Sequence, residues 1–159
     1  MFQLLNTNLY VGSKYELNQT NEVNWAFVHA CKTSHFERLG RQINTSPHYI
    51  IFEEDSHLYI NWVDAPSPVM FDWNGEGIKN FIIALDFIDK WISTKKVFVH
   101  CDQGQSRSPA VVMLYLAKRS KLISADFEKA KLEFAKIYPD YFVDSGITKF
   151  IGQNWNNLI

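Results

Sequence analysis

A chain of 159 residues with 47% hydrophobic content is expected to form one domain, spanning 1–159, with a sizeable core. Its net charge of −1 gives no electrostatic basis for binding nucleic acid or an anionic membrane surface, and no apolar run approaches membrane-spanning length. The first residues lack the features of a signal peptide, and two cysteines make no disulfide framework, so we expect a cytoplasmic protein.

The first half of the chain predicts strands. Leu9–Ser13 has the pattern of a short strand that ends at a turn. The mostly apolar run Trp25–Cys31 has the length of a buried strand. Tyr49–Phe52 and Leu58–Val63 predict a hairpin around the acidic segment Glu53–His57, which is expected to be a solvated turn rather than a metal site.

The second half predicts helices. From Glu76 to Trp91, apolar residues recur at spacings of three and four, which is typical of a helix with one apolar face. Two further helices are expected, one over Ala125–Ile137 with Ser124 as its N-cap, and a last one from Asp144 or Ser145 to Trp155. Strands followed by helices indicate an α/β sheet covered by helices, with its ligand outside the carboxyl end of a strand.

The segment His100–Ser108 carries the strongest chemical signal. It follows the β-branched run Lys96–Val99 and leads into the apolar helical run Pro109–Ala117, so a strand ends in a loop that opens a helix. A helix N-terminus presents free N–H groups and the positive end of its dipole, which suits an anion. The loop amides and Arg107 would favour the thiolate form of Cys101, and Arg107 can hold two phosphate oxygens. A nucleophile beneath an anion cradle predicts a phosphate-transfer site.

His100, Cys101, Arg107 and Ser108 stand at the spacing H-C-x5-R-S, and this pattern resembles the cysteine-dependent protein phosphatases, especially their compact dual-specificity branch. Leu9–Ser13 is similar to the Leu-Tyr-hydrophobic-Gly-Ser segment common in that branch. Gln103 and Gln105 replace the small residues usual around the glycine, and such a loop is more similar to bacterial or phage-type members. The resemblance implies a single-domain fold with a central mixed, mostly parallel sheet flanked by helices.

The resemblance also implies roles for the loop. Cys101 would attack phosphorus and form a phosphoenzyme, and Ser108 would stabilise the thiolate as it leaves. His100 would have a supporting role, because in the family its ring bonds to the loop backbone and helps to stabilise the thiolate. The phosphate would be held by the backbone N–H groups of Asp102, Gln103, Gly104, Gln105, Ser106 and Arg107, together with the Arg107 guanidinium.

The leaving group also needs a proton, which calls for a carboxylic acid on a nearby loop. Asp64 is the first choice, because it follows a strand expected to be central, and because Trp62-Val63-Asp64 resembles the Trp-Pro-Asp loop of tyrosine phosphatases. Asp72 is the alternative general acid, since its distance from the following helix is nearer to that in compact relatives. An aspartate so close to a helix start is, however, commonly a cap.

Cys31, the second cysteine, follows a predicted strand. Lipid-phosphatase relatives have a cysteine in the corresponding place that can form a disulfide with the nucleophile, so Cys31 is a candidate redox partner of Cys101, against the default of an inert buried thiol. His29, Cys31 and His35 resemble a metal-ligand set but lack a fourth partner. Phosphoenzyme chemistry needs no metal, so we expect neither a metal nor another cofactor.

The sequence therefore predicts a metal-independent phosphatase for phosphomonoesters, with phosphotyrosine proteins and also phosphoserine or phosphothreonine proteins as substrates. One alternative is a phosphatase for a nucleotide, RNA end, lipid or sugar phosphate. The absence of lysine from the loop disfavours polyanionic inositol lipids within that group. Another alternative is a module that binds phosphate without hydrolysis, although such proteins usually lose the cysteine or the arginine. A sulfur- or arsenate-transfer enzyme fits the His-Cys and Arg-Ser-Pro sequences less well. Oligomeric state stays open.

Overall fold

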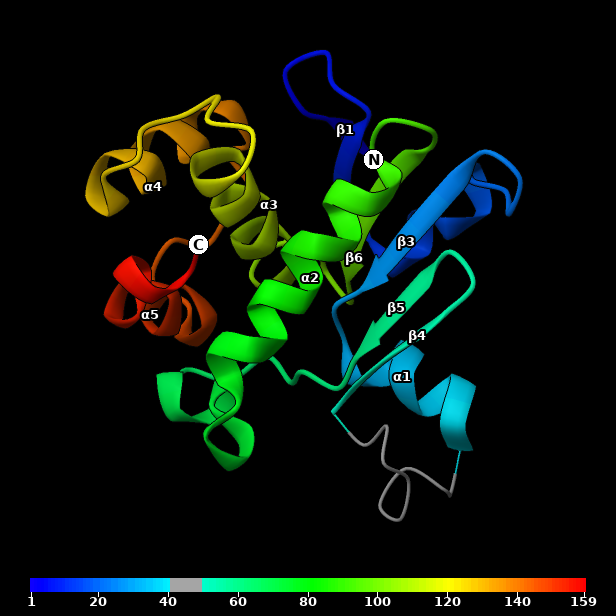
Figure 1. The fold of residues 1–159 in the computed structure, drawn as a ribbon, viewed down its shortest axis with the longest axis horizontal. Coiled ribbons are helices and arrows are strands. Elements are labelled where there is room, and N and C mark those ends of the chain that lie inside the picture. The colour runs from blue at the N-terminus through cyan, green and yellow to red at the C-terminus, as the bar shows by residue number, and fades with distance from the viewer. Residues whose placement is uncertain (41–49) are drawn as a thin grey trace.

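The computed structural model describes residues 1–40 and 50–159, which form a six-stranded sheet and its surrounding helices (Figure 1). The strands are β1 (Phe2–Gln3), β2 (Leu9–Ser13), β3 (Trp25–His29), β4 (Ile51–Glu54), β5 (His57–Ile60) and β6 (Lys96–Cys101). Their order across the sheet is β1-β2-β6-β3-β5-β4. The four inner strands run parallel, and both edge strands are antiparallel to their neighbours. The predicted mixed, mostly parallel sheet is confirmed.

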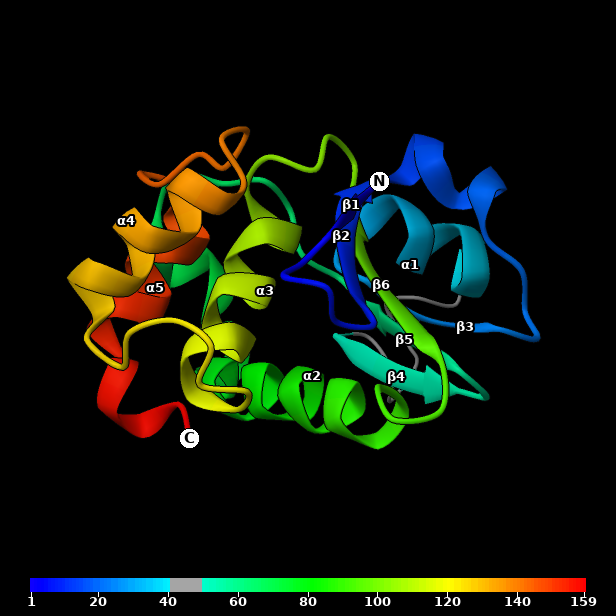
Figure 2. The same ribbon diagram turned by 90° about the horizontal axis from the view of Figure 1, so that it is seen from above.

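The α-helices are α1 (Lys32–Leu39), α2 (Gly77–Trp91), α3 (Arg107–Lys118), α4 (Phe127–Ile137) and α5 (Gly146–Gln153). Short 3-10 turns lie at η1 (Lys14–Gln19), η3 (Pro68–Phe71), η4 (Trp73–Gly75) and η5 (Trp155–Asn157). Viewed from above, α2, α3, α4 and α5 lie on one side of the sheet and α1 lies on the other (Figure 2). None of the helices in the described part of the chain is long and apolar enough to cross a membrane.

The inner strands alternate between two chemically different faces, as the two-residue period of a strand requires. In β6, Val97 and Val99 face the aliphatic core that α2 and α3 complete. Phe98 and His100 face the other way, where Phe98 joins a smaller aromatic cluster with Trp25. Both faces are buried, which explains why these strands read as continuous apolar runs in the sequence.

The parallel strands set the place of the functional loops. Because β2, β6, β3 and β5 point the same way, their carboxyl ends meet at one edge of the sheet. The segments that follow them therefore gather there, and β6 lies between β2 and β3 with its last residue, Cys101, beside Ser13.

Several boundaries differ from the sequence predictions. The strand before Asp64 is β5, which ends at Ile60 and pairs with an edge strand rather than lying at the centre. The N-cap of α4 is Asp126, whose side chain accepts from the Lys129 N–H, while the Ser124 hydroxyl accepts from the Asp126 N–H. Both residue types cap helices well, so composition alone did not separate them.

At the last helix the choice between Asp144 and Ser145 is resolved. Ser145 caps α5, which ends at Gln153, and a separate 3-10 turn holds Trp155. Tyr49, where the hairpin was expected to begin, lies outside the described residues, and β4 begins at Ile51.

Candidate active site

The loop between β6 and α3 turns tightly at Gly104. This residue has φ of +73°, a conformation that disfavours residues with a side chain. A Cβ atom built on Gly104 would lie 2.8 Å from the carbonyl carbon of Gly12, so the loop backbone packs directly against the end of β2. The close approach and the left-handed conformation both require glycine here.

Two carbonyl groups of the loop are bound on its outer side. The Tyr138 hydroxyl donates to the Gly104 carbonyl at 2.7 Å, and the Phe142 N–H donates to the Gln105 carbonyl at 2.7 Å. Since the peptide bonds are trans and planar, the N–H groups of Gln105 and Ser106 point the opposite way. Among residues 1–40 and 50–159, no oxygen accepts from the N–H groups of residues 102–106. The loop is thus a run of backbone donors that lack a protein acceptor in the part of the chain that the structure describes.

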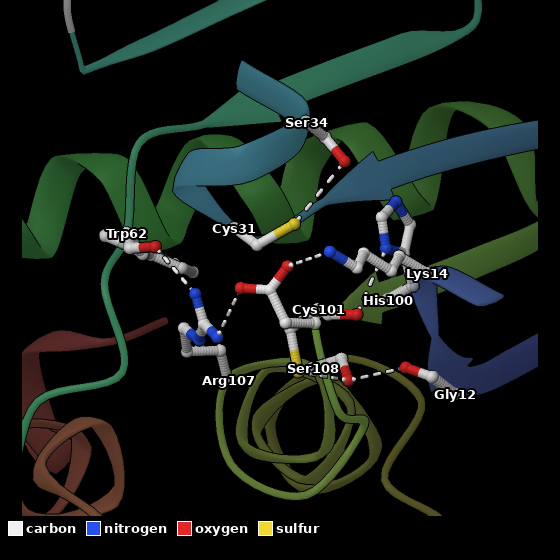
Figure 3. Close-up of polar contacts among 10 residues, drawn as sticks. Gly12, Lys14, Cys31, Ser34, Trp62, His100, Cys101, Arg107 and Ser108 are labelled. Carbon is white, nitrogen blue, oxygen red and sulfur yellow. Dashed lines mark hydrogen bonds and ion pairs between the residues drawn. The ribbon is translucent and has the colours of Figure 1, made fainter. Parts of the chain in front are cut away.

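Cys101 lies beneath this loop and is 1% exposed. Its sulfur lies 3.2 Å from the Ser108 Oγ, and Ser108 is also close enough to donate to the Gly12 carbonyl at 3.1 Å (Figure 3). With a neutral thiol, the S–H can donate to Ser108 while the hydroxyl donates to Gly12. With a thiolate, the hydroxyl can turn and donate to sulfur instead. Ser108 is thus placed to respond to the charge on Cys101.

Arg107 is buried, at 4% exposed, and two hydrogen bonds hold its guanidinium in a defined orientation. One terminal nitrogen donates to the Trp62 carbonyl at 2.8 Å, and the other donates to the Asp102 carboxylate at 3.1 Å (Figure 3). Its buried Nε has no hydrogen-bond partner in the described part of the chain. The guanidinium therefore keeps its Nε–H available for an anion, and one N–H of a terminal nitrogen is engaged by a carboxylate that carries negative charge as a phosphate does.

Asp102 lies between two cations, because Lys14 approaches its carboxylate at 3.5 Å and Arg107 bonds to it. Burial acts to raise the pKa of Asp102, but hydrogen bonds from Thr33 and Arg107 and the charges of Arg107 and Lys14 hold it below its usual value. The carboxylate is consequently a stable anion at the mouth of the loop.

His100 is completely buried, and burial lowers its pKa to about 4. Its Nδ1 lies 3.4 Å from the Cys101 carbonyl oxygen, and its Nε2 lies 2.5 Å from Nδ1 of His29. The ring is therefore neutral near pH 7 and contacts the Cys101 carbonyl, and its supporting role stays a prediction.

A pocket of about 450 Å³ opens beside the loop. Its walls are formed by Lys32, Thr33, Phe36, Glu37, Val63, Asp64, Asp102 and Arg107. Asp64, the predicted general acid, thus shares a pocket with Arg107. The alternative, Asp72, accepts a hydrogen bond from the Gly77 N–H at 3.0 Å at the start of α2. This geometry favours Asp64 as the acid and gives Asp72 a capping role, and both roles stay predictions.

Comparison with known proteins identifies the family. A model of the dual specificity phosphatase catalytic domain matches residues 6–131. The chain belongs to this family. Human dual specificity protein phosphatase 5 is 33% identical over 89 residues, which make up 54% of this chain and 22% of that protein. The match thus spans about a fifth of that relative's length.

Two solved structures of similar fold extend the comparison. The Yvh1 phosphatase domain from Chaetomium thermophilum superposes with a TM-score of 0.62 at 16% identity, covering 97% of this chain and 94% of that one. A human tyrosine phosphatase-like serine/threonine/tyrosine-interacting protein has a TM-score of 0.60 at 17% identity, covering 94% and 91%. At such identities the likeness concerns the fold. These relatives are eukaryotic, and the similarity to bacterial or phage-type members stays a prediction.

In this dual specificity phosphatase domain, Cys31 is fully buried after β3. Its thiol donates to the Ser34 hydroxyl at 3.4 Å, and burial raises its pKa (Figure 3). Both cysteines are free, and their sulfurs point to different serines. His29 contacts two histidines and His35 packs edge-on against Phe52 at 5.5 Å. Within the described residues, no group of three or more histidine, cysteine or acidic side chains is arranged to hold a metal.

Three residues that contact the domain's loop were not predicted from the sequence: Tyr138, Lys14 and Phe142. Tyr138 and Phe142 bind loop carbonyls from positions more than 30 residues away in the chain, with no motif around them. Lys14 has a weak local signal, because it directly follows Leu9–Ser13, a predicted strand that is similar to a segment common in the dual-specificity branch.

Proposed function

We propose that this protein is a metal-independent phosphatase that hydrolyses phosphomonoesters through a cysteinyl-phosphate intermediate. One observation carries the proposal: within the described residues, the N–H groups of residues 102–106, which directly follow the buried Cys101, have no protein acceptor. Gly104 and Ser106 are buried, so their unpaired N–H groups are costly, and an oxyanion bound at the loop would satisfy them. The family membership supports the same activity.

The site supplies each step of a two-stage hydrolysis. The Cys101 thiolate attacks phosphorus while the bond from phosphorus to the ester oxygen breaks, and Asp64 donates its proton to that oxygen. The loop N–H groups and Arg107 stabilise the transferring oxygens. A water molecule then attacks the phosphoenzyme, Asp64 takes a proton from that water, and the sulfur leaves as a thiolate that accepts a hydrogen bond from Ser108.

The proposed substrates are phosphotyrosine proteins, with phosphoserine and phosphothreonine proteins where the pocket admits shorter side chains. The aromatic and aliphatic wall provided by Phe36 and Val63 favours a phenyl ester. The second candidate is a small non-protein molecule that carries a single phosphomonoester. Asp102 places negative charge at the mouth of the loop, which disfavours polyphosphorylated ligands and leaves singly phosphorylated ones among the non-protein substrates. Retention of both Cys101 and Arg107 argues against a module that only binds phosphate. We also propose that 1–159 folds as one domain and acts in the cytoplasm.

Hydrolysis of an aryl phosphate in the presence of a metal chelator tests the activity. We expect turnover that vanadate inhibits and that the Cys101→Ser variant loses. The matched control is Cys31→Ser, which changes the other buried cysteine and should retain turnover. A wild-type protein that binds phosphopeptides but hydrolyses neither them nor the aryl ester would refute the proposal and favour the binding module.

A further inference from the structure

A continuous row of side chains joins the catalytic loop to the protein surface. Nδ1 of His100 lies 3.4 Å from the Cys101 carbonyl oxygen, and Nε2 of His100 lies 2.5 Å from Nδ1 of His29. Nε2 of His29 lies 2.8 Å from Nδ1 of His57, whose Nε2 lies 2.7 Å from the Glu22 carboxylate. The three histidines come from the adjacent strands β6, β3 and β5, so the sheet itself aligns them (Figure 1).

Both ends of this row are acceptors, and that fixes the number of protons it needs. The Cys101 carbonyl and the ionised Glu22 carboxylate each require a donor from the neighbouring ring, and each ring-to-ring contact also requires one hydrogen. Four contacts thus need four hydrogens. Three neutral imidazoles carry three, so a row of neutral rings leaves one contact between two lone pairs. One additional proton completes every contact.

The additional charge belongs at the outer end. His29 and His100 are buried, and burial first and the neighbouring rings second hold the pKa of His29 well below its usual value. At the outer end His57 is paired with Glu22, whose side chain is 73% exposed. Glu22 and His57 also line a pocket of about 320 Å³, so water can reach this end. A proton added at this end would have the Glu22 carboxylate beside it and would leave no buried charge unpaired.

We propose, on the basis of the phosphatase function above, that Glu22, His57 and His29 are positioning residues that hold one extra proton and thereby fix His100 as a donor to the Cys101 carbonyl. With that proton, Nδ1 of each ring carries hydrogen and donates toward the loop. Without it, each ring donates toward Glu22, and the lone pair of His100 Nδ1 faces the Cys101 carbonyl. In a row of neutral rings the contact without a hydrogen is the one between His100 and the Cys101 carbonyl, because at 3.4 Å it is the longest of the four.

The direction of this hydrogen bond affects the loop. The Cys101 carbonyl belongs to the same peptide group as the N–H of Asp102, which is the first of the unpaired loop donors. A hydrogen bond accepted by the carbonyl polarises the peptide and strengthens its N–H as a donor to the thiolate or the phosphate. A proton held at the surface by His57 and Glu22 thus strengthens the Asp102 N–H of the loop as a hydrogen-bond donor, through His29 and His100.

Other charged groups near the row bear on its titration. The groups around it are Glu54 on β4 and Tyr59 on β5 near His57, and Asp102, Arg107 and Lys14 near His100. Glu54 is the cross-strand neighbour of His57, but its carboxylate bonds to Arg38 and makes no hydrogen bond to the row among the described residues, so it offers a matched control for a nearby charge that is not part of the row.

Imidazole nitrogen chemical shifts measured by NMR test the proposal directly. In the unliganded wild-type protein at neutral pH, we expect hydrogen on Nδ1 of His29 and His100 and on both nitrogens of His57. At alkaline pH, His29 and His100 should change together to hydrogen on Nε2. His100 with hydrogen on Nε2 at neutral pH would overturn the proposal. This readout needs no turnover, so the row can be confirmed even if the protein proves inactive.

The Glu22→Gln variant provides the functional test, since Glu22 is exposed and its replacement does not disturb the core. The coupled change of the rings should move to lower pH, because the imidazolium loses its anion. Alkylation of Cys101 by iodoacetamide at neutral pH should become about twofold to tenfold slower, which is the range for one hydrogen bond. Glu54→Gln should leave both measurements near wild type. Equal effects of the two variants would mean that Cys101 responds to any lost negative charge near His57 and not to the hydrogen-bonded row, which would overturn the proposal. No effect of Glu22→Gln would also refute it.

Discussion

Asp102 occupies the position where a bound phosphate would compete with it. Its carboxylate engages one terminal nitrogen of Arg107 at 3.1 Å and is approached by Lys14. A substrate dianion that takes both arms of the guanidinium has to displace this carboxylate. Asp102 therefore lowers the affinity of the loop for anions, because it competes with them for Arg107, and at the same time it keeps Arg107 oriented.

Replacing Asp102 by Asn is predicted to strengthen anion binding. The variant removes a negative charge beside the phosphate, and its amide competes less well for the guanidinium, so inhibition by inorganic phosphate should require about threefold to tenfold less phosphate. Inhibition of aryl phosphate hydrolysis measures this. Weaker inhibition in the variant would show that orientation of Arg107 matters more than competition.

The two candidate acids differ in surroundings and should differ in effect. Asp64→Asn is predicted to lower kcat for a phosphotyrosine peptide by about a hundredfold or more, because a poor leaving group depends on the proton. An aryl ester with a better leaving group should be affected less. Asp72→Asn should lose only the cap of α2 and keep kcat near wild type. A larger kcat loss in Asp72→Asn would reverse the assignment.

At the scale of elements, the loop depends on its contact with the end of α4. The Tyr138 hydroxyl lies 2.7 Å from the Gly104 carbonyl, and burial raises the pKa of Tyr138 to about 12, so it stays a donor. The region after α4 thus holds the outer side of the loop, while β2 holds the inner side through Gly12.

Tyr138→Phe is therefore predicted to lower the free energy of unfolding by about 1–2 kcal/mol, since a buried carbonyl loses its donor. The control Tyr141→Phe also removes a buried hydroxyl, which bonds to Thr148 rather than to the loop. Both variants should lose stability in urea titrations, but only Tyr138→Phe should reduce kcat/KM. Equal activity of the two would show that the loop keeps its shape without Tyr138.

The elements also show which features could be predicted from sequence. The loop, its strand and its helix were found because the motif is local and each part has its own residue pattern. The strand before Asp64 was expected to be central, and it is an inner strand that lies next to the edge strand β4; its exact place could not be predicted, because the order of strands depends on crossovers that leave no local trace. The bond from Arg107 to Trp62 joins positions 45 residues apart. Such contacts follow from the fold and not from the spacing of residues.

For the whole molecule, the buried histidines predict acid sensitivity. The pKa of His100 is lowered from 6.5 to about 4 in the folded protein, so the unfolded chain takes up this proton first as the pH falls. The stability that neutral His100 contributes is present above about pH 6.5 and is lost progressively down to about pH 4. The loss from this residue amounts to about 3 kcal/mol.

Urea unfolding at a series of pH values measures this loss. Protonation of carboxylates adds to the acid slope, so the His100→Asn variant serves as the reference. The variant should lose stability less steeply than wild type between these pH values. Parallel slopes would mean that His100 titrates alike in the folded and unfolded states.

The contrast between the aliphatic and aromatic faces of the sheet has a consequence for folding fidelity. In β6, Val97 and Val99 lie on one face and Phe98 and His100 on the other. If β6 mispaired with β3 by a single residue, an imidazole would enter the aliphatic layer and the nucleophile would turn toward the aromatic one. Such a mispaired sheet would bury a polar ring without its partners and would be strongly disfavoured. Chains that reach a stable sheet are thereby also chains whose reactive sulfur faces the loop.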